Sequence, residues 1–153
     1  MEFLACVKEV LSKVKQPGYR ELKEAIKLIG CTSEKILPYV TDPDQFSYGR
    51  NVIYRSDRVE AIVIHIPGMK QTPIHNHGNS IGCGQVVEGN LINQLYVLEK
   101  DDEPFGYEEN RFAQGQFFFA TKGQIHQMRN PSAERLITFH IYSPPLQDMK
   151  IYK

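Results

Sequence analysis

Apolar residues near the start of the chain recur at steps of three and four positions. The first such stripe is Phe3, Leu4, Val7, Val10, Leu11 and Val14. This spacing predicts an amphipathic helix, and Pro17-Gly18 predicts its end. A second stripe (Leu22, Ala25, Ile26 and Ile29) predicts another helix that ends at Gly30, and a helical turn around Glu34 to Leu37 is expected before Pro38. We therefore expect residues 1–40 to form a helical segment that covers one face or end of the remaining chain.

From about residue 46 the pattern changes to short runs of β-branched and aromatic residues, which are typical of strands. The runs are Val52–Tyr54, Val59–Ile66, Ile81–Val87, Leu91–Leu98, Phe117–Phe119 and Leu136–Tyr142. Glu88-Gly89-Asn90 predicts a hairpin, and Asp101–Pro104 predicts an exposed loop. Roughly seven or eight short antiparallel strands predict a sandwich or small barrel over about residues 46–145. With 153 residues, the chain is expected to be a single α+β domain with a dominant β body.

Composition narrows the class of protein. Eighteen Lys and Arg balance eighteen Asp and Glu, and this balance argues against a nucleic-acid surface or a polybasic membrane patch. No apolar run approaches the ~20 residues of a membrane span, and the first residues do not have the pattern of a signal peptide. Cys6, Cys31 and Cys83 fit neither a disulfide framework nor a cysteine-based zinc site. We expect a cytoplasmic monomer with reduced thiols and with no nucleic-acid or membrane partner.

All five histidines lie in the predicted strand region: His65, His75, His77, His126 and His140. Side chains at i and i+2 of an extended segment point the same way, so His75-Asn76-His77 can direct two imidazoles at one metal ion. The pair alone is equally compatible with two exposed loop histidines. His65 belongs to no motif, and we interpret it as structural.

Glycines and a third histidine surround this pair in a recognisable order. Gly68 precedes it and Gly89 follows it, and Gly115, Gly123, His126 and Asn130 form a second spaced set. Two such half-motifs resemble those of the cupin barrels, over roughly residues 60–145. The resemblance implies a jelly-roll barrel of antiparallel strands in which His75, His77 and His126 converge on one metal ion.

The ligand set departs from the usual cupin pattern. A typical cupin places a glutamate a few residues after the His-x-His segment, whereas residues 78–83 contain no carboxylate. The implied ligands are then three neutral imidazoles, which suit Fe, Zn, Cu or Ni. Because no ligand is anionic, the metal keeps its positive charge for an anionic substrate, and a thiolate is a natural fit.

Four segments make a closer resemblance: Tyr48-Gly49-Arg50-Asn51, His75-Asn76-His77, Gly123-Gln124-Ile125-His126 and Thr138-Phe139-His140-Ile141-Tyr142-Ser143-Pro144-Pro145. In this order, over about two-thirds of the chain, they resemble the cysteine dioxygenases. These are small cupins that use non-haem Fe(II) and O2 to oxidise L-cysteine to cysteine sulfinate. The resemblance implies one Fe(II) per chain at the three histidines and O2 as co-substrate.

The same resemblance implies roles for five further residues. Arg50 would pair with the substrate carboxylate, for which its planar fork is suited, and Tyr48 would assist it. Thr138, His140 and Tyr142 stand at i, i+2 and i+4 of a strand and so face one side. They would form a catalytic row in which Tyr142 is a hydrogen-bond donor and acid. Read singly, Arg50 could be a surface arginine, and His140 and Tyr142 could be core residues.

One position separates members of this family. Mammalian members carry a cysteine five residues after the second ligand histidine, and it forms a thioether with the active-site tyrosine. Here that position is Gly82, and the neighbouring Cys83 would face the other side of the strand. We therefore predict no Cys83–Tyr142 crosslink, as in bacterial members.

The sequence leaves substrate and reaction class open. Relatives that oxidise 3-mercaptopropionate carry glutamine in place of the arginine, so Arg50 favours cysteine. Three neutral histidines with an open position also suit a zinc hydrolase or lyase. A non-catalytic cupin that binds a small molecule is a third possibility, although neither of these two explains why Arg50 and Tyr142 accompany the histidines.

Overall fold

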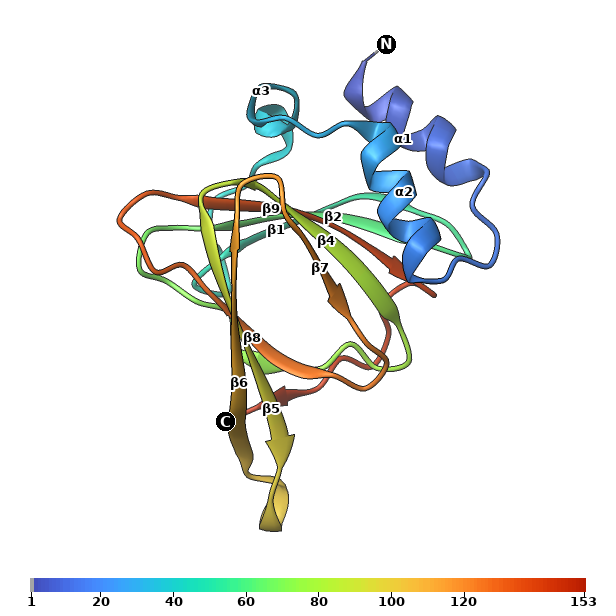
Figure 1. The fold of residues 1–153 in the computed structure, drawn as a ribbon. Coiled ribbons are helices and arrows are strands. Elements are labelled where there is room, and N and C mark those ends of the chain that lie inside the picture. The colour runs from blue at the N-terminus through green and yellow to red at the C-terminus, as the bar shows by residue number, and fades with distance from the viewer. Residues whose placement is uncertain (1) are drawn as a thin grey trace.

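Two five-stranded sheets face each other in the computed structural model, which describes residues 2–153 (Figure 1). The first sheet has the order β1 (Gly49–Arg55), β2 (Glu60–Ile66), β9 (Leu136–Ser143), β4 (Ile81–Glu88), β7 (Phe117–Ala120). The second has the order β10 (Ile151–Tyr152), β3 (Ile74–His75), β8 (Ile125–Arg129), β5 (Asn90–Leu98), β6 (Pro104–Ala113). Neighbouring strands are antiparallel. The predicted β barrel with N-terminal helices is confirmed.

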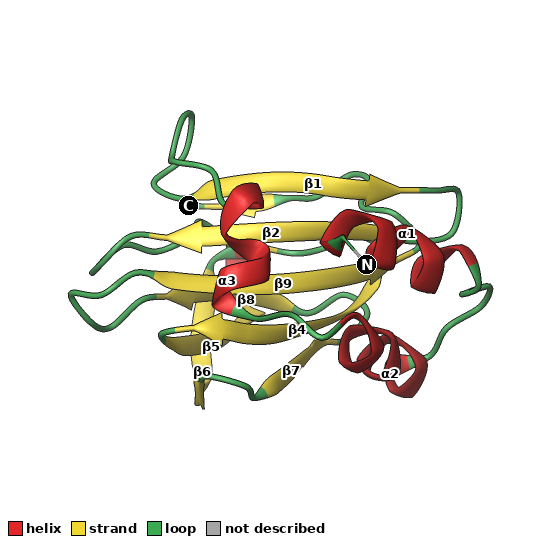
Figure 2. Cartoon of the chain, turned by 90° about the horizontal axis from the view of Figure 1, so that it is seen from above, coloured by secondary structure: helices red, strands yellow, loops and turns green. Residues whose placement is uncertain are grey.

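The helical segment covers the outer face of the first sheet (Figure 2). It comprises α1 (Phe3–Ser12), α2 (Tyr19–Ile29), α3 (Ser33–Ile36) and a 3-10 turn at Leu37–Tyr39. The predicted stripes face the core, with Val7, Leu22 and Ile26 fully buried. Gly30 ends α2 in the left-handed region at φ 68°, where a glycine is favoured. Within residues 2–153, none of the helices combines the length and the apolar character that a membrane crossing requires.

Strand β9 contributes side chains to two hydrophobic cores, one under the helices and one inside the barrel. Ile137, Phe139 and Ile141 pack under the helices, and the Phe139 ring meets Phe3 edge-on at 6.1 Å between centroids. Full burial of such a side chain contributes about 1.5–3 kcal/mol. Because side chains alternate along a strand, the even-numbered residues 138–142 turn into the barrel. The apolar face toward the helices thus fixes which side chains reach the barrel interior.

The predicted hairpin at Glu88-Gly89-Asn90 is wrong. Strand β4 pairs with β9 and β7, whereas β5 pairs with β6 and β8, so this turn carries the chain from one sheet to the other. Gly89 has φ 93°, and a Cβ atom there would lie 2.5 Å from the Arg135 carbonyl oxygen. A tight corner between the two sheets therefore requires glycine here. A hairpin turn favours glycine for the same reason, so the local sequence does not distinguish the two.

Besides β8, the strand that contains His126, three strands lie outside the runs identified from the sequence. Strand β6 is an edge strand with mostly exposed residues, among them Phe105 and Tyr107, so it lacks the apolar alternation that identifies a half-buried strand. Strands β3 and β10 have two residues each and are too short to leave a pattern. The expected loop before Pro104 contains a 3-10 turn at Lys100–Asp102.

Candidate metal centre

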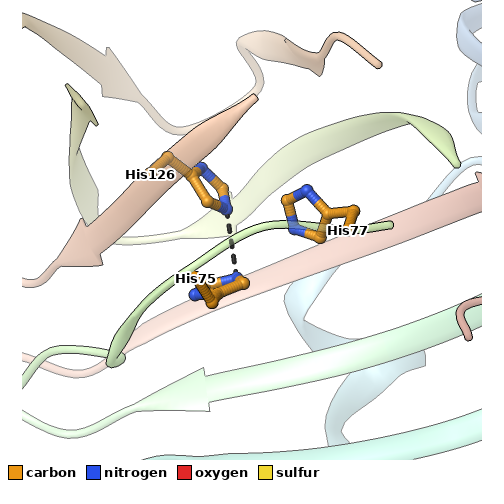
Figure 3. A group of neighbouring side chains, drawn as sticks. All are labelled: His75, His77 and His126. Atoms are coloured by element: carbon orange, nitrogen blue, oxygen red, sulfur yellow. Dashed lines mark hydrogen bonds between the residues drawn. The ribbon is translucent and has the colours of Figure 1, made fainter. Parts of the chain in front are cut away.

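His75, His77 and His126 meet inside the barrel, as the sequence predicted (Figure 3). His75 on β3 is the direct partner of His126 on β8, and His77 follows two residues after His75. Ring centroids are 5.0 Å apart for His75–His77 and 4.7 Å apart for each of the other two pairs. One ring nitrogen from each residue lies within 4.8 Å of the others, and all three side chains are buried. Strand pairing across the second sheet therefore builds the group.

Hydrogen bonds fix the tautomers of two of these rings. His75 Nδ1 donates to the Pro73 carbonyl at 2.7 Å, and His126 Nδ1 donates to Asn93 Oδ1 at 2.8 Å. Each neutral ring has one hydrogen, so both Nε2 atoms are left with a lone pair. These two Nε2 atoms are 3.2 Å apart, the contact drawn as a dashed line in Figure 3. Two lone pairs directed at one place favour a cation between or beside them.

Burial keeps the three imidazoles neutral. It lowers the pKa of His75, and it lowers the pKa values of His77 and His126 well below the usual 6.5. The neighbouring imidazoles lower the pKa values of His77 and His126 further, and the charge of Arg50 acts in the same direction on His75. A metal ion would therefore meet unprotonated ligands at neutral pH.

The donor set fits a borderline transition metal. Over residues 2–153, the group consists of histidines without a carboxylate or a cysteine. Three neutral imidazoles suit Fe, Zn, Cu or Ni. His77 Nδ1 is also buried and has no hydrogen-bond partner in the described chain, so no hydrogen bond from this nitrogen fixes the tautomer of the His77 ring. The residues present thus fit a three-histidine metal site.

The two predicted substrate-binding residues border the same pocket as two of the three histidines. Its polar lining is Tyr48, Arg50, Thr72, His75, His77 and Tyr142, and its apolar lining is Ile62, Ile64, Met128, Leu146 and Met149. Arg50 lies on edge strand β1 and is exposed, whereas Tyr48 is buried. Burial raises the pKa of Tyr48, against the opposing charge of Arg50, so its hydroxyl is protonated. The pocket thus offers one permanent cation and one phenol to an anionic ligand.

The predicted row on β9 is present as a chain of hydrogen bonds. Thr138 Oγ1 lies 2.6 Å from His140 Nε2, and the Tyr142 hydroxyl lies 3.2 Å from His140 Nδ1. The same hydroxyl is 3.4 Å from His77 Nε2. Burial lowers the pKa of His140 to about 3 and raises that of Tyr142, so both are neutral near pH 7. The row joins a buried threonine to the metal-binding group through a phenol that keeps its proton.

Gly82 and Cys83 lie on opposite faces of β4. Gly82 pairs with Tyr142, and a Cβ atom at Gly82 would lie 2.6 Å from two carbons of the tyrosine ring. Cys83 packs in the core under the helices, and burial raises the pKa of its thiol to about 12. This placement turns the sulfur away from Tyr142 and supports the expectation of no crosslink.

Sequence reasoning missed several residues of the site. Asn93 holds His126, and Leu146 and Met149 line the pocket. A single polar residue in a predicted strand, or apolar residues after the last predicted strand, carries no signal without knowledge of the neighbours. His65 lies outside the group with Nδ1 3.0 Å from the Thr41 carbonyl oxygen, in line with a structural role.

Solved structures with the same barrel share little sequence with this chain. The protein TT1209 from Thermus thermophilus is 19% identical, covers 72% of this chain and 94% of its own, and superposes with a TM-score of 0.59. An uncharacterized conserved protein with a double-stranded β-helix domain from Klebsiella pneumoniae is 18% identical over 77% and 94%, with a TM-score of 0.60. The Cnp3 cupin domain of Schizosaccharomyces pombe is 15% identical over 71% of each chain, with a TM-score of 0.53. These likenesses establish the double-stranded β-helix, or cupin, fold.

The sequence match goes further than the fold. Residues 35–153 match the family described as cysteine dioxygenase type I. The matched range contains all ten strands of the described chain, the three histidines, Arg50 and the row on β9. This family implies a dioxygenase whose metal site is the three-histidine group. The chain belongs to the cysteine dioxygenase type I family.

Proposed function

We propose that this protein is a non-haem iron(II) thiol dioxygenase that oxidises L-cysteine with O2 to cysteine sulfinate (3-sulfinoalanine). The observation that carries the proposal is that Arg50, two of the three metal-binding histidines and Tyr142 border one pocket. A zinc hydrolase would need the histidines but has no evident use for the arginine or for the row on β9. The family match supports the same reaction class.

Substrate binding would rest on Arg50 and Tyr48. The guanidinium would pair with the cysteine carboxylate, and the Tyr48 hydroxyl would donate a second hydrogen bond to it. Anchoring that end of the substrate would direct its thiol and amine toward the histidines. Ferrous iron held by His75, His77 and His126 would supply the one-electron chemistry that dioxygen requires.

The row on β9 would control a proton. Where Thr138 donates to His140 Nε2, His140 Nδ1 donates to the Tyr142 oxygen, and the phenol hydrogen is free to point at the substrate. Overall, cysteine loses its S–H bond and gains two S–O bonds. Both oxygen atoms come from one O2, the thiol proton is released, and sulfur provides all the electrons that O2 accepts. No external reductant is needed.

Arg50 also supports cysteine over 3-mercaptopropionate, since relatives that prefer the latter carry glutamine at this position. We further propose that the enzyme works as a cytoplasmic monomer, and the balanced net charge supports the absence of nucleic-acid or membrane partners. The three cysteines are unpaired among residues 2–153, and this too supports a reducing compartment.

The test is to load the protein with Fe(II) under anaerobic conditions, add cysteine and O2, and identify the product by mass. We expect cysteine with two added oxygen atoms and an equal molar uptake of O2. A parallel reaction uses 3-mercaptopropionate, and faster turnover of that thiol would contradict the assignment to cysteine. Zinc in the isolated protein, with no thiol-dependent O2 uptake after iron loading, would contradict the dioxygenase itself.

A further inference from the structure

The chain folds back over the pocket after β9. We name residues 144–152, which run from the end of β9 through β10, the C-terminal strap (Figure 1). Leu146 is buried and, with Met149, lines the pocket that Arg50, His75 and His77 border. Part of the apolar wall beside the metal group is therefore supplied by this segment rather than by the barrel strands.

The first half of the strap is fixed to the first sheet. Leu146 N donates to Glu60 Oε1 at 2.8 Å, and Ser80 Oγ donates to the Pro144 carbonyl at 2.6 Å. Glu60 is 2% exposed, so its carboxylate oxygen is bonded to this backbone group away from solvent. Because this hydrogen bond is shielded from solvent, it holds the Leu146 backbone against β2.

The second half is fixed to the residue between two of the histidines. Asn76 N donates to the Lys150 carbonyl at 3.0 Å, and Lys150 N donates to Asn76 Oδ1 at 2.9 Å. Asn76 Nδ2 donates to the Tyr152 hydroxyl at 3.2 Å, and Ile151 pairs with His75 in the β10–β3 ladder. The strap is therefore bonded to the same segment that carries His75 and His77.

We propose that the C-terminal strap sets the upper size limit of the substrate, with Leu146 and Met149 as its specificity-determining residues. Both ends of the segment are anchored, so these two side chains cannot swing away without breaking several hydrogen bonds. Arg50 would hold the carboxylate end of the substrate and the histidines its thiol end, so an added methylene has to be accommodated against the apolar wall that Leu146 and Met149 help to form. The proposal rests on the proposed function, and it selects short amino thiols over homologues that are one methylene longer.

The experiment compares L-cysteine with L-homocysteine, which carries the same thiol, amine and carboxylate on a longer chain. Leu146→Ala, Met149→Ala and the double variant are measured for kcat/KM by O2 uptake. They are also measured for equilibrium binding of both thiols to the zinc-loaded protein, which needs no turnover. One methylene in an apolar pocket is worth about 10–200-fold, so the double variant should raise the homocysteine-to-cysteine ratio at least about tenfold. Leu28→Ala and Met69→Ala, both at exposed positions, are matched controls and should leave the ratio unchanged.

A variant that enlarges the side chain instead of shortening it tests the proposal if the alanine variants do not fold. Leu146→Phe adds bulk and should weaken cysteine binding about tenfold or more, while the protein still binds zinc. An unchanged thiol ratio in folded alanine variants, or undiminished cysteine binding by Leu146→Phe, would overturn the strap proposal alone. If the wild type binds thiols selectively but consumes no O2, the proposed function fails and the strap proposal stands.

Discussion

Asn93 Oδ1 accepts a hydrogen bond from His126 Nδ1 at 2.8 Å, and both side chains are buried. The amide comes from β5 and the imidazole from the neighbouring strand β8. This bond places the ring hydrogen on Nδ1 and leaves Nε2 free beside His75. Metal-binding histidines are generally oriented by such a bond, which also makes the free nitrogen a better ligand.

Replacing Asn93 by leucine should therefore weaken metal binding. Leucine has a similar size but no acceptor, so His126 loses its fixed tautomer and orientation. We expect metal affinity to fall about 10–100-fold, measured by competition with a chelator. Asn110→Leu, at a position on β6 outside the metal group, is the control and should bind metal like the wild type. Equal affinity of Asn93→Leu and wild type would show that the bond has no role in the site.

Removing His126 should abolish iron binding and activity together. The ring supplies one of three ligand atoms, and the remaining pair does not define a three-coordinate site. Iron content by metal analysis and cysteine-dependent O2 uptake should both drop to background in His126→Ala. His65→Ala removes a histidine outside the group and should keep both. Retention of iron and turnover by His126→Ala would mean that the metal centre lies elsewhere.

Changing Arg50 to alanine should separate substrate binding from metal binding. A charge-assisted hydrogen bond contributes about 1.5–3 kcal/mol, but Arg50 is exposed, and solvent screening reduces that value. We expect KM for cysteine to rise about tenfold with iron content unchanged. Arg55→Ala, on the same strand but outside the pocket lining, is the matched control. An unchanged KM would remove Arg50 from the substrate site.

Substitutions on β9 should affect turnover more than binding. Tyr142→Phe removes the donor beside His77, and we expect kcat to fall about 100-fold with little change in KM. Thr138→Val removes the hydroxyl that holds His140 and should lower kcat by about tenfold, whereas Thr138→Ser keeps the hydroxyl and should behave like the wild type. If valine and serine at this position gave equal kcat values, the row would be only a packing feature.

Acid should destabilise the metal-free protein because of its buried histidines. The pKa of His140 is about 3 in the folded protein and about 6.5 in the unfolded chain, so below pH 6.5 the unfolded chain binds the proton more readily. The contribution of neutral His140 to the free energy of unfolding is fully present above pH about 6.5. It is lost as the pH falls toward 3, at up to about 1.4 kcal/mol per pH unit. Urea unfolding at pH 7, 6 and 5 measures the free energy of unfolding, which should fall less steeply with decreasing pH in His140→Gln than in the wild type. A free energy of unfolding that stays constant from pH 7 to 5 would refute this.

Most strands that the sequence identified have two buried faces or one clear apolar face. β9 is buried along nearly its whole length, and its alternation placed Thr138, His140 and Tyr142 on one side correctly. Strand β6 was not predicted because an exposed edge strand needs no apolar pattern. The turn at Gly89 was assigned wrongly because the need for a left-handed residue does not reveal which sheet the next strand joins.

The amino-acid order by itself determined the local chemistry of this protein. His75 and His77 share a direction because they are two residues apart in extended chain, and the row on β9 follows from the same period. Tertiary structure alone decided what those groups meet. Register across β3 and β8 brought His126 to His75, the neighbouring β5 supplied Asn93, and the returning C-terminal strap closed the pocket with Leu146 and Met149. Such contacts join residues far apart in the chain and depend on strand pairing and close packing, which no local spacing encodes.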